Sequence, residues 1–376
     1  MTAEARAAAV SARRLGELIW LAALALLVIA CAAVGVIAVL HAVDDLPKMQ
    51  TDFTVFWTAG RVPREAIYDI DAITRAQAWA LTRPDPTRPF PYPPTFLFYI
   101  EPFSRLPAFQ ALLLWDAVGV TAFCLAARAL VGRVWPLMIA SPAFACALIA
   151  GQPAFLVGGG LMAALLALPR RPLLAGILFG VLATIKPQIL LLVPVGLIVA
   201  RRWRTLYAAL AAGAVIGLVS LIVHGDLWLR WLRMLPQFNH IIENDAWDME
   251  IGVTPKALAW ALGLSGTPIA WAIIIAGVAL GLWTVAAAFR DEDPLRRYAA
   301  LCAGYLLVSP YALWYELVLL LPPAVAMLAA RGWITRGAGV LAYAFFPKSL
   351  AVLATALRML GPLPWTRAVP SDHGKW

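Results

Sequence analysis

An apolar run near the amino terminus constrains the fold of this chain most strongly. It extends from about Leu15 to Val43, which exceeds the about 20 apolar residues that an α-helix needs to cross a bilayer. The whole chain is similarly apolar, since 62% of its 376 residues are hydrophobic and only 14% are charged. The run is too long for the apolar core of a cleavable signal peptide. We therefore predict an all-α polytopic membrane protein, with one domain over residues 1–376 and this run as its first spanning helix.

Basic residues predict the orientation of the chain in the membrane. Arg6, Arg13 and Arg14 precede the first helix and place the amino terminus in the cytoplasm, because cytoplasmic loops are enriched in Lys and Arg. Cytoplasmic loops and anionic lipid headgroups also explain the net charge of +9 better than nucleic acid does. Later basic clusters recur at Arg128/Arg133, Arg170–Arg171, Arg201–Arg204, Arg290–Arg297 and Arg331–Arg336.

Short apolar segments between these clusters predict membrane hairpins whose outer apices carry proline. Proline removes a backbone donor and interrupts a helix, and interrupted helices are tolerated in a membrane where they line a cavity. We therefore predict a bundle of about 10 to 12 transmembrane helices, with broken half-helices around one outward-facing cavity. The predicted hairpin arms are Val134–Ala150 with Pro153–Leu168, Pro172–Ile185 with Gln188–Ala200, Arg296–Ser309 with Ala312–Ala329, and Gly337–Phe346 with Ser349–Leu360.

Two long polar segments are then expected on the outer surface. The first, Asp44–Pro91, is predicted to contain short helices over Pro63–Tyr68 and Asp71–Leu81. The second covers His224–Val253 and is expected to be a loop. Between them, Leu112–Val131 is the predicted crossing, and Pro94–Arg105 is expected in the outer interface or re-entering the membrane.

Residue patterns exclude several kinds of site. The four cysteines lie in apolar runs without a C-x-x-C pair, which favours packing over zinc or redox chemistry. The acidic stretch Glu243–Glu250 matches no EF-hand spacing. There is no Gly-rich phosphate loop and no Walker A run. We therefore expect no metal, no cofactor and no nucleotide-sugar site.

Two charged residues stand out within apolar segments. Lys186 lies between two apolar half-helices, where an unpartnered cation costs about 2.5–3.5 kcal/mol on insertion scales. It either binds an anionic ligand or extends its ammonium group to the outer surface. Glu316 lies in an apolar helix after Pro310. It is either functional or paired with a nearby Arg or Lys.

Several motifs together resemble those of a known family. They are Asp52–Gly60 (DFTVFWTAG), Tyr68-Asp69, Tyr92-Pro93-Pro94, Gly151-Gln152, Lys186-Pro187 followed by Arg201–Arg204, and Ser309-Pro310-Tyr311. Over about residues 15–330, their order and spacing resemble glycosyltransferase family 87, whose members are polyprenol-phosphate-mannose-dependent mannosyltransferases and relatives with the GT-C membrane fold. Trp314-Tyr315-Glu316 departs from the pattern, since several relatives carry a histidine or an aspartate there.

The resemblance implies an inverting transfer of a hexose, mannose by family default, from a polyprenyl-phosphate sugar to a lipid or glycan acceptor. It implies a catalytic aspartate in the first outer loop, for which Asp52 is the candidate base; the alternative is that Asp52 only caps the following helix. The other candidates belong to two groups. Donor-phosphate candidates are Lys186, His240 and Arg233; sugar or acceptor candidates are Gln152, Gln188, Tyr92, Trp57, Tyr311, Asp44 and Asp45.

Each of these side chains also has a structural interpretation. His240 is equally an ordinary loop histidine, Arg233 an interfacial anchor, and the aromatic residues members of a membrane-interface belt. Gln152 and Gln188 are equally suited to packing or backbone hydrogen bonds, and Asp44 and Asp45 to solvated positions.

The predicted setting is a bacterial inner membrane with the active site facing the periplasm. The partners are the lipid-linked donor, the acceptor and membrane lipids, with no nucleic acid; the oligomeric state, the sugar and the acceptor stay open. The alternative function is a secondary transporter or a translocator of lipid-linked sugars, which would also explain broken helices and buried charge.

Overall fold

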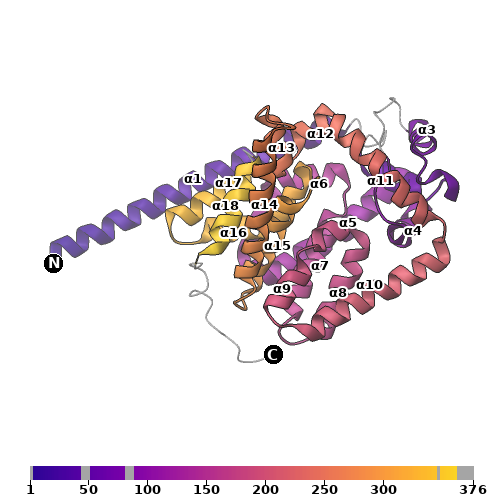
Figure 1. The fold of residues 1–376 in the computed structure, drawn as a ribbon. Helices are drawn as coiled ribbons and strands as arrows, with labels where there is room; N and C mark the ends of the chain where they lie inside the picture. The colour runs from indigo at the N-terminus through magenta and orange to yellow at the C-terminus, as the bar shows by residue number, and fades with distance from the viewer. Residues whose placement is uncertain (1–2, 44–50, 81–88, 345–347, 362–376) are drawn as a thin grey trace.

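The computed structural model of the chain describes residues 3–43, 51–80, 89–344 and 348–361. Over these ranges the protein forms 18 α-helices and five short 3-10 helices, without a strand (Figure 1). Four helices in the described part are long and apolar enough to cross a membrane, and one bent pair would add a fifth. The all-α membrane class is confirmed. The total of 10 to 12 crossings stays a prediction.

The first spanning helix, α1 (Ala3–Val43), has 41 residues and a length of about 60 Å at 1.5 Å per residue. Figure 1 shows its amino-terminal part projecting from the body of the protein. The rest of the helix packs against α6 (Pro142–Ala150) and η3 (Gly132–Ala140). Nearer its amino terminus, Glu17 forms an ion pair with Arg336 at 2.7 Å, and the ring of Trp20 meets that of Trp333 edge-on at 5.9 Å. The predicted first helix is confirmed.

The other long apolar helices frame the bundle. They are α5 (Ala108–Val131), which confirms the predicted crossing there, α10 (Trp203–His224) and α14 (Pro268–Ala288), which follows the short α13 (Pro255–Ala261).

A sharp bend separates α6 (Pro142–Ala150) from α7 (Ala154–Ala167), whose axes differ by 116°. Gly151 lies in the bend with a φ of +63°, a backbone conformation that glycine adopts without steric cost. A Cβ atom there would lie 2.7 Å from the Cβ of Phe53 and 2.6 Å from Leu112 Cδ1. The bend therefore brings the start of α7 against the first outer segment.

The first arm of this hairpin was predicted as one segment, Val134–Ala150, and that prediction is wrong. The chain instead forms a 3-10 helix, η3 (Gly132–Ala140), and then α6. Ser141 between them is extended, with φ −77° and ψ 139°. A proline disfavours helical geometry in the residue before it, so Pro142 forces the break.

The remaining hairpins follow the predicted plan, with 3-10 turns at two of the apices. The proline at each of these apices interrupts the hydrogen-bond ladder, as expected. The elements are α8 (Pro172–Ile185), η4 (Pro187–Leu190) and α9 (Val193–Val199); α15 (Pro294–Val308), η5 (Trp314–Leu320) and α16 (Leu321–Ala329); and α17 (Trp333–Ala344) and α18 (Lys348–Leu360).

Short helices make up the first outer segment and the stretch after it. The prediction over Asp71–Leu81 is confirmed by α3, but that over Pro63–Tyr68 is wrong beyond a single 3-10 turn. After this turn Tyr68 is buried, and its hydroxyl donates a hydrogen bond to the carbonyl of Tyr92. The elements are α2 (Phe53–Ala59), η1 (Arg64–Ala66), α3 (Ile70–Ala80), η2 (Pro94–Phe96) and α4 (Leu97–Ser104).

The second outer segment, His224–Val253, is largely helical, and its place as a second periplasmic loop stays a prediction. It consists of α11 (Leu227–Asn244) and α12 (Ala246–Ile251). Helix α11 is amphipathic, although the segment contains many charged residues. Leu227 and Met234 on one face are buried, while the opposite face is exposed. An amphipathic helix of this kind suits a position in the membrane interface.

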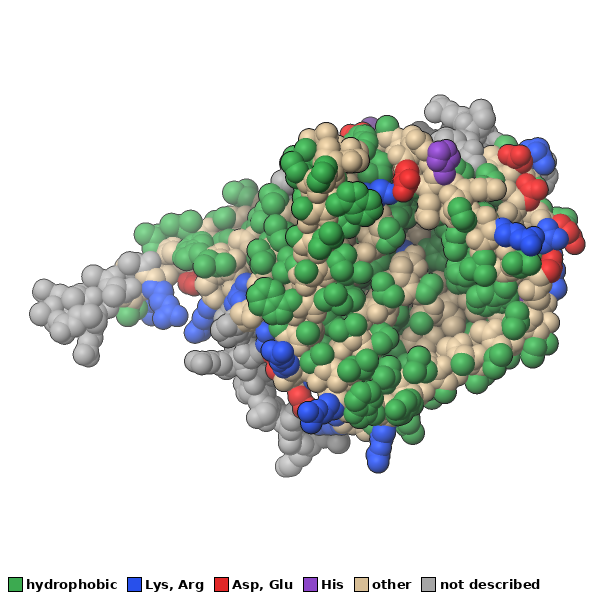
Figure 2. All heavy atoms as spheres, viewed as in Figure 1, with side chains coloured by type: hydrophobic (Ala, Val, Ile, Leu, Met, Phe, Trp, Pro, Cys, Tyr) green, Lys and Arg blue, Asp and Glu red, His purple; other side chains and the backbone are tan. Residues whose placement is uncertain are grey.

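The side chains on the visible face are arranged in bands. In Figure 2, Lys and Arg gather along the lower left edge, acidic and basic groups gather at the upper right, and hydrophobic side chains cover most of the surface between them. This arrangement is typical of an apolar belt between two polar rims.

Helices α5 and α7 approach each other closely at Gly159, so a larger side chain there is expected to destabilise the protein. A Cβ on Gly159 would lie 2.7 Å from the backbone carbonyl carbon of Ala122. We expect Gly159→Ala to push the helices apart and to destabilise the protein by about 1–3 kcal/mol, measured by unfolding in detergent. The control is Gly217→Ala on α10, which meets nothing within 4 Å and should stabilise by about 0.5–1 kcal/mol. Equal effects of the two changes would contradict the packing argument.

Candidate active site

Asp52 lies at the amino-terminal end of α2, in the N-cap position. Its carboxylate makes no capping hydrogen bond to that helix, so capping is not what holds this side chain. Instead, its Oδ2 accepts a hydrogen bond of 2.8 Å from Nε2 of Gln152. Asp52 is half-buried, and it is fixed by a residue 100 positions away in the sequence.

Gln152 connects Asp52 to two tyrosines. The hydroxyl of Tyr92 donates to Gln152 Oε1 at 3.0 Å, and the hydroxyl of Tyr68 donates to the backbone carbonyl of Tyr92 at 2.8 Å. Because Tyr92 occupies the amide oxygen, the amide nitrogen of Gln152 must face Asp52. A glutamine held in this way donates to the carboxylate and fixes its orientation.

Aromatic packing fixes Tyr92 in this network. Its ring centroid lies 4.5 Å from that of Phe96, 5.0 Å from that of Phe56 and 5.9 Å from that of Phe90. Aromatic pairs at these separations contribute about 0.5–1.5 kcal/mol each beyond the area they bury. Phe53 and Phe96 also contact the ring of Trp115 in α5, so the first outer segment is anchored to the bundle at the position where it presents Asp52.

Lys186 lies at the end of α8 and forms a buried ion pair with Glu316 in η5. The two residues are 3% and 1% exposed, which excludes the alternative that Lys186 extends to the outer surface. Of the two interpretations of Glu316, the structure shows the pairing with a nearby cation. The second carboxylate oxygen of Glu316, Oε2, is buried without a hydrogen-bond partner in the described structure.

The Asp52 network and the Lys186–Glu316 pair meet around Tyr92. Burial raises the pKa of Tyr92 well above its ordinary value, and the negative charges of Glu316 and Asp52 raise it further. A hydrogen bond also joins the two parts of the site: Thr95 Oγ1, three residues after Tyr92, donates to the carbonyl of Thr184, two residues before Lys186, at 2.6 Å. The Nζ atom of Lys186 also lies 5.8 Å from the ring centroid of Tyr315, next to Glu316 in the chain. One region thus holds an oriented carboxylate and a buried cation.

The other predicted site residues have different surroundings. Trp57 is buried, its Nε1 donates to the carbonyl of Leu106, and Arg61 stacks over its ring at 4.7 Å; it supports α2 instead of lining a cavity. Gln188 is exposed in the η4 apex next to Lys186. Asp44 and Asp45 lie outside the described residues.

Helix α11 carries the remaining candidates and approaches the site at two points. Trp231 Nε1 donates to the carbonyl of Pro91 at 2.9 Å, and the ring of Phe238 meets that of Tyr311 edge-on at 5.8 Å. Arg233 and His240 are exposed on this helix. The helix therefore contacts both the segment before Tyr92 and the apex that carries Tyr311, with Arg233 and His240 on its exposed surface.

Sequence reasoning missed one buried carboxylate. Asp116 in α5 is 8% exposed, and its Oδ1 has no hydrogen-bond partner in the described structure. Its neighbours on the helix face α7, since Leu112 and Gly119 approach Gly151 and Phe155. The available signal was a lone carboxylate within an apolar helix, which is a functional hypothesis by default.

Comparison with known proteins gives one match. The sequence profile of glycosyltransferase family 87 matches residues 90–310, which is more than half of the 376-residue chain. The chain belongs to glycosyltransferase family 87. No curated protein and no solved structure matches it. As a family 87 protein the chain is a glycosyltransferase, which favours the enzyme over the predicted alternative of a transporter.

The family match covers part of the candidate site of this glycosyltransferase. Tyr92, Gln152 and Lys186 lie within the matched residues, whereas Asp52 and Glu316 lie outside them. The contacts of Asp52 with Gln152 and of Glu316 with Lys186 connect the unmatched residues to the matched ones. Among the described residues, no group of three or more His, Cys, Asp or Glu is placed to hold a metal ion.

Tyr92→Phe tests the network around Asp52 in this family 87 enzyme. The change removes the hydroxyl that orients Gln152 and leaves the packed ring, so we expect about 1 kcal/mol of lost orientation and about a fivefold lower rate. The measure is the initial rate of sugar transfer. The control is Tyr99→Phe, which removes a hydroxyl bonded to Thr184 at 2.8 Å and should leave the rate unchanged. The opposite ranking of the two variants would contradict the role of Tyr92.

Proposed function

We propose that this family 87 glycosyltransferase moves a hexose, with mannose as the first candidate, from a polyprenyl-phosphate sugar to a lipid or glycan acceptor. The observation that carries the proposal is an oriented carboxylate and a buried cation that are joined through hydrogen bonds of Tyr92 and Thr95 in the same short segment. A transfer of this kind needs a base for the acceptor hydroxyl and a positive group for the departing phosphate. Asp52 and Lys186 supply these two groups.

The proposed reaction is a single displacement with inversion at the anomeric carbon. The acceptor oxygen forms a bond to that carbon while the carbon–oxygen bond to the lipid phosphate breaks. The hydroxyl proton passes to the carboxylate of Asp52, and both electrons of the broken bond leave with the polyprenyl phosphate. Gln152 keeps the Asp52 carboxylate in one orientation, in which the carboxylate can face the acceptor hydroxyl.

Lys186 requires an exchange of partners before it can hold the donor phosphate. Glu316 occupies its ammonium group in the buried pair, and a phosphodiester carries the same single negative charge as a carboxylate. The donor phosphate would replace Glu316 at the cation, and the ammonium group would then stabilise the charge that grows on the phosphate as it leaves. Gln188 lies exposed two residues beyond Lys186 and is placed to bind polar groups of the donor.

Helix α11 suits the entry of lipid-linked substrates. It is amphipathic, it is joined to the site through Trp231 and Phe238, and it exposes Leu229 and Leu232. Arg233 and His240 on its exposed surface would attract a lipid phosphate toward the site. We place this helix in the outer interface of a bacterial inner membrane, with the active site facing the periplasm.

A panel of donors tests the proposed function. Purified protein in lipid vesicles is given radiolabelled polyprenyl-phosphate mannose, glucose and arabinose, and nucleotide sugars in parallel, with a membrane glycolipid extract as acceptor. We expect label to pass to the extract from one of the lipid-phosphate donors and from no nucleotide sugar. Transfer from a nucleotide sugar alone would contradict the proposal.

A further inference from the structure

A groove opens at the surface opposite the candidate active site. It has a volume of about 590 Å³ and is lined by Arg171, Pro172, Leu173, Leu174 and Arg204. It lies between the beginnings of α8 and α10. Helix α8 ends directly before Lys186, and α10 leads into α11 beside the site. The groove therefore lies at the far ends of two helices that position the active site.

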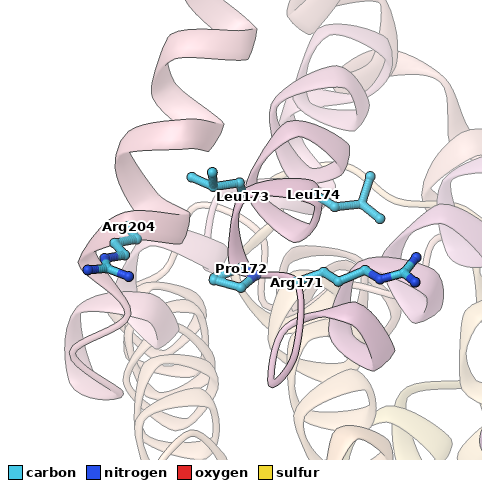
Figure 3. Close-up of a pocket in the computed structure, with 5 residues that line it drawn as sticks. All are labelled: Arg171, Pro172, Leu173, Leu174 and Arg204. Carbon is cyan, nitrogen blue, oxygen red and sulfur yellow. The ribbon is translucent and has the colours of Figure 1, made fainter.

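The floor of this groove is apolar and its flanks are cationic. Leu173 and Leu174 are 60% and 40% exposed, which is typical of side chains that face lipid. Figure 3 shows Arg204 and Arg171 on opposite sides of Pro172 and Leu173, with their guanidinium groups pointing apart. A molecule lying over Pro172 and Leu173 would have a cation on each flank.

Within the described ranges, acidic side chains leave the positive charge of this groove unpaired. Arg170, Arg171, Arg201 and Arg204 are exposed, and none of them takes part in the ion pairs among the described residues. Nearby Arg202, by contrast, pairs with Glu292. An anionic partner would supply the missing countercharge.

Aromatic residues place the groove at a lipid boundary. Trp203 and Tyr207 on α10 are 46% and 65% exposed, and exposed Trp and Tyr are enriched where hydrocarbon meets headgroups. The apolar floor therefore faces acyl chains, while the arginines lie at headgroup level. A free anion would leave Leu173 and Leu174 uncovered, and a soluble protein partner would not reach them.

We propose that this groove binds an anionic phospholipid of the leaflet opposite the active site. Its headgroup lies over Pro172, with Arg204 on one flank and Arg171 on the other, and one acyl chain covers Leu173 and Leu174. Basic pockets between membrane helices bind anionic headgroups in this way. The lipid would hold together α8 and α10, which meet closely where the backbone oxygen of Thr205 lies 2.5 Å from the position of a Cβ on Gly176.

The test is the binding of a fluorescent phosphatidylglycerol to the full chain in detergent, by titration at low salt. Each basic residue near an anionic headgroup contributes about fivefold, so we expect Arg171→Gln with Arg204→Gln to raise the Kd about 30-fold. The matched control is Arg128→Gln with Arg133→Gln, which removes two exposed arginines outside the groove and should leave the Kd unchanged. Gel filtration of each variant confirms that it is folded.

Two further experiments distinguish lipid binding in the groove from general electrostatic attraction of the lipid to basic surfaces. Leu173→Trp fills the apolar floor without changing charge and should also weaken binding of phosphatidylglycerol. Inorganic phosphate, which has no acyl chain, should not displace the fluorescent lipid at concentrations that leave ionic strength unchanged. An equal loss in the control pair, full binding by Leu173→Trp, or displacement by inorganic phosphate would each overturn the proposal.

Discussion

Asp52→Asn is expected to abolish sugar transfer from the lipid-phosphate donor while the protein stays folded. Asparagine keeps the shape of the side chain and can still accept the hydrogen bond from Gln152, but it cannot take a proton from the acceptor hydroxyl. Loss of a general base lowers the rate by about 10²–10⁴-fold. The measurement is the initial rate of transfer in vesicles, with the melting temperature of each protein beside it.

A second carboxylate in the same outer segment provides the control. Asp71 is exposed in α3, and Asp71→Asn removes the same charge from the same surface without touching the network of Gln152 and Tyr92. We expect wild-type rates from that variant. Normal turnover by Asp52→Asn would remove Asp52 from the role of base, and equal losses in both variants would assign the effect to surface charge.

Breaking the Lys186–Glu316 pair is expected to have the second largest effect. Both residues are buried, so Lys186→Met leaves an uncompensated carboxylate and should destabilise the protein by about 3–5 kcal/mol. Replacing both partners, as Lys186→Met with Glu316→Gln, removes both buried charges and should recover most of that stability. Transfer should stay lost in the double variant, because no cation is left for the departing phosphate.

This pair of variants separates structure from catalysis. Stability is measured by thermal unfolding in detergent, and function by the KM for the donor and by the rate. If the double variant is stable and also transfers sugar with an unchanged donor KM, then the pair only holds α8 against η5. In that case the donor phosphate must bind elsewhere, and α11 with Arg233 and His240 would be the region to test.

The apolar segments and prolines of the sequence predicted most helices and most of the breaks between them. The bounds of α8 agree with the predicted arm Pro172–Ile185, and the prolines that interrupt the helices marked most apices. The pattern failed at Ser141–Pro142, where an unbroken apolar composition concealed a break. It also gave no helix over α11, because the many charged residues there concealed the amphipathic spacing.

The site depends on contacts that local patterns cannot specify. Asp52 and Gln152 are 100 positions apart, and Lys186 and Glu316 are 130 positions apart. Their partners follow from how the bent helices pack, which periodicity does not determine. The same packing buried Trp57 and oriented Tyr92, so that of two similar aromatic candidates one supports the fold and the other touches the proposed catalytic network.

The most direct test of this account is a structure of the enzyme with a non-transferable polyprenyl-phosphate sugar. We predict the phosphate beside Lys186, with Glu316 displaced from the ammonium group, and the anomeric carbon facing Asp52. Space for an acceptor oxygen should remain between Asp52 and the anomeric carbon, with that oxygen about 3–3.5 Å from the carbon, as reacting atoms need. A donor phosphate bound away from Lys186, or a sugar with Asp52 on the side of its leaving group, would contradict the account.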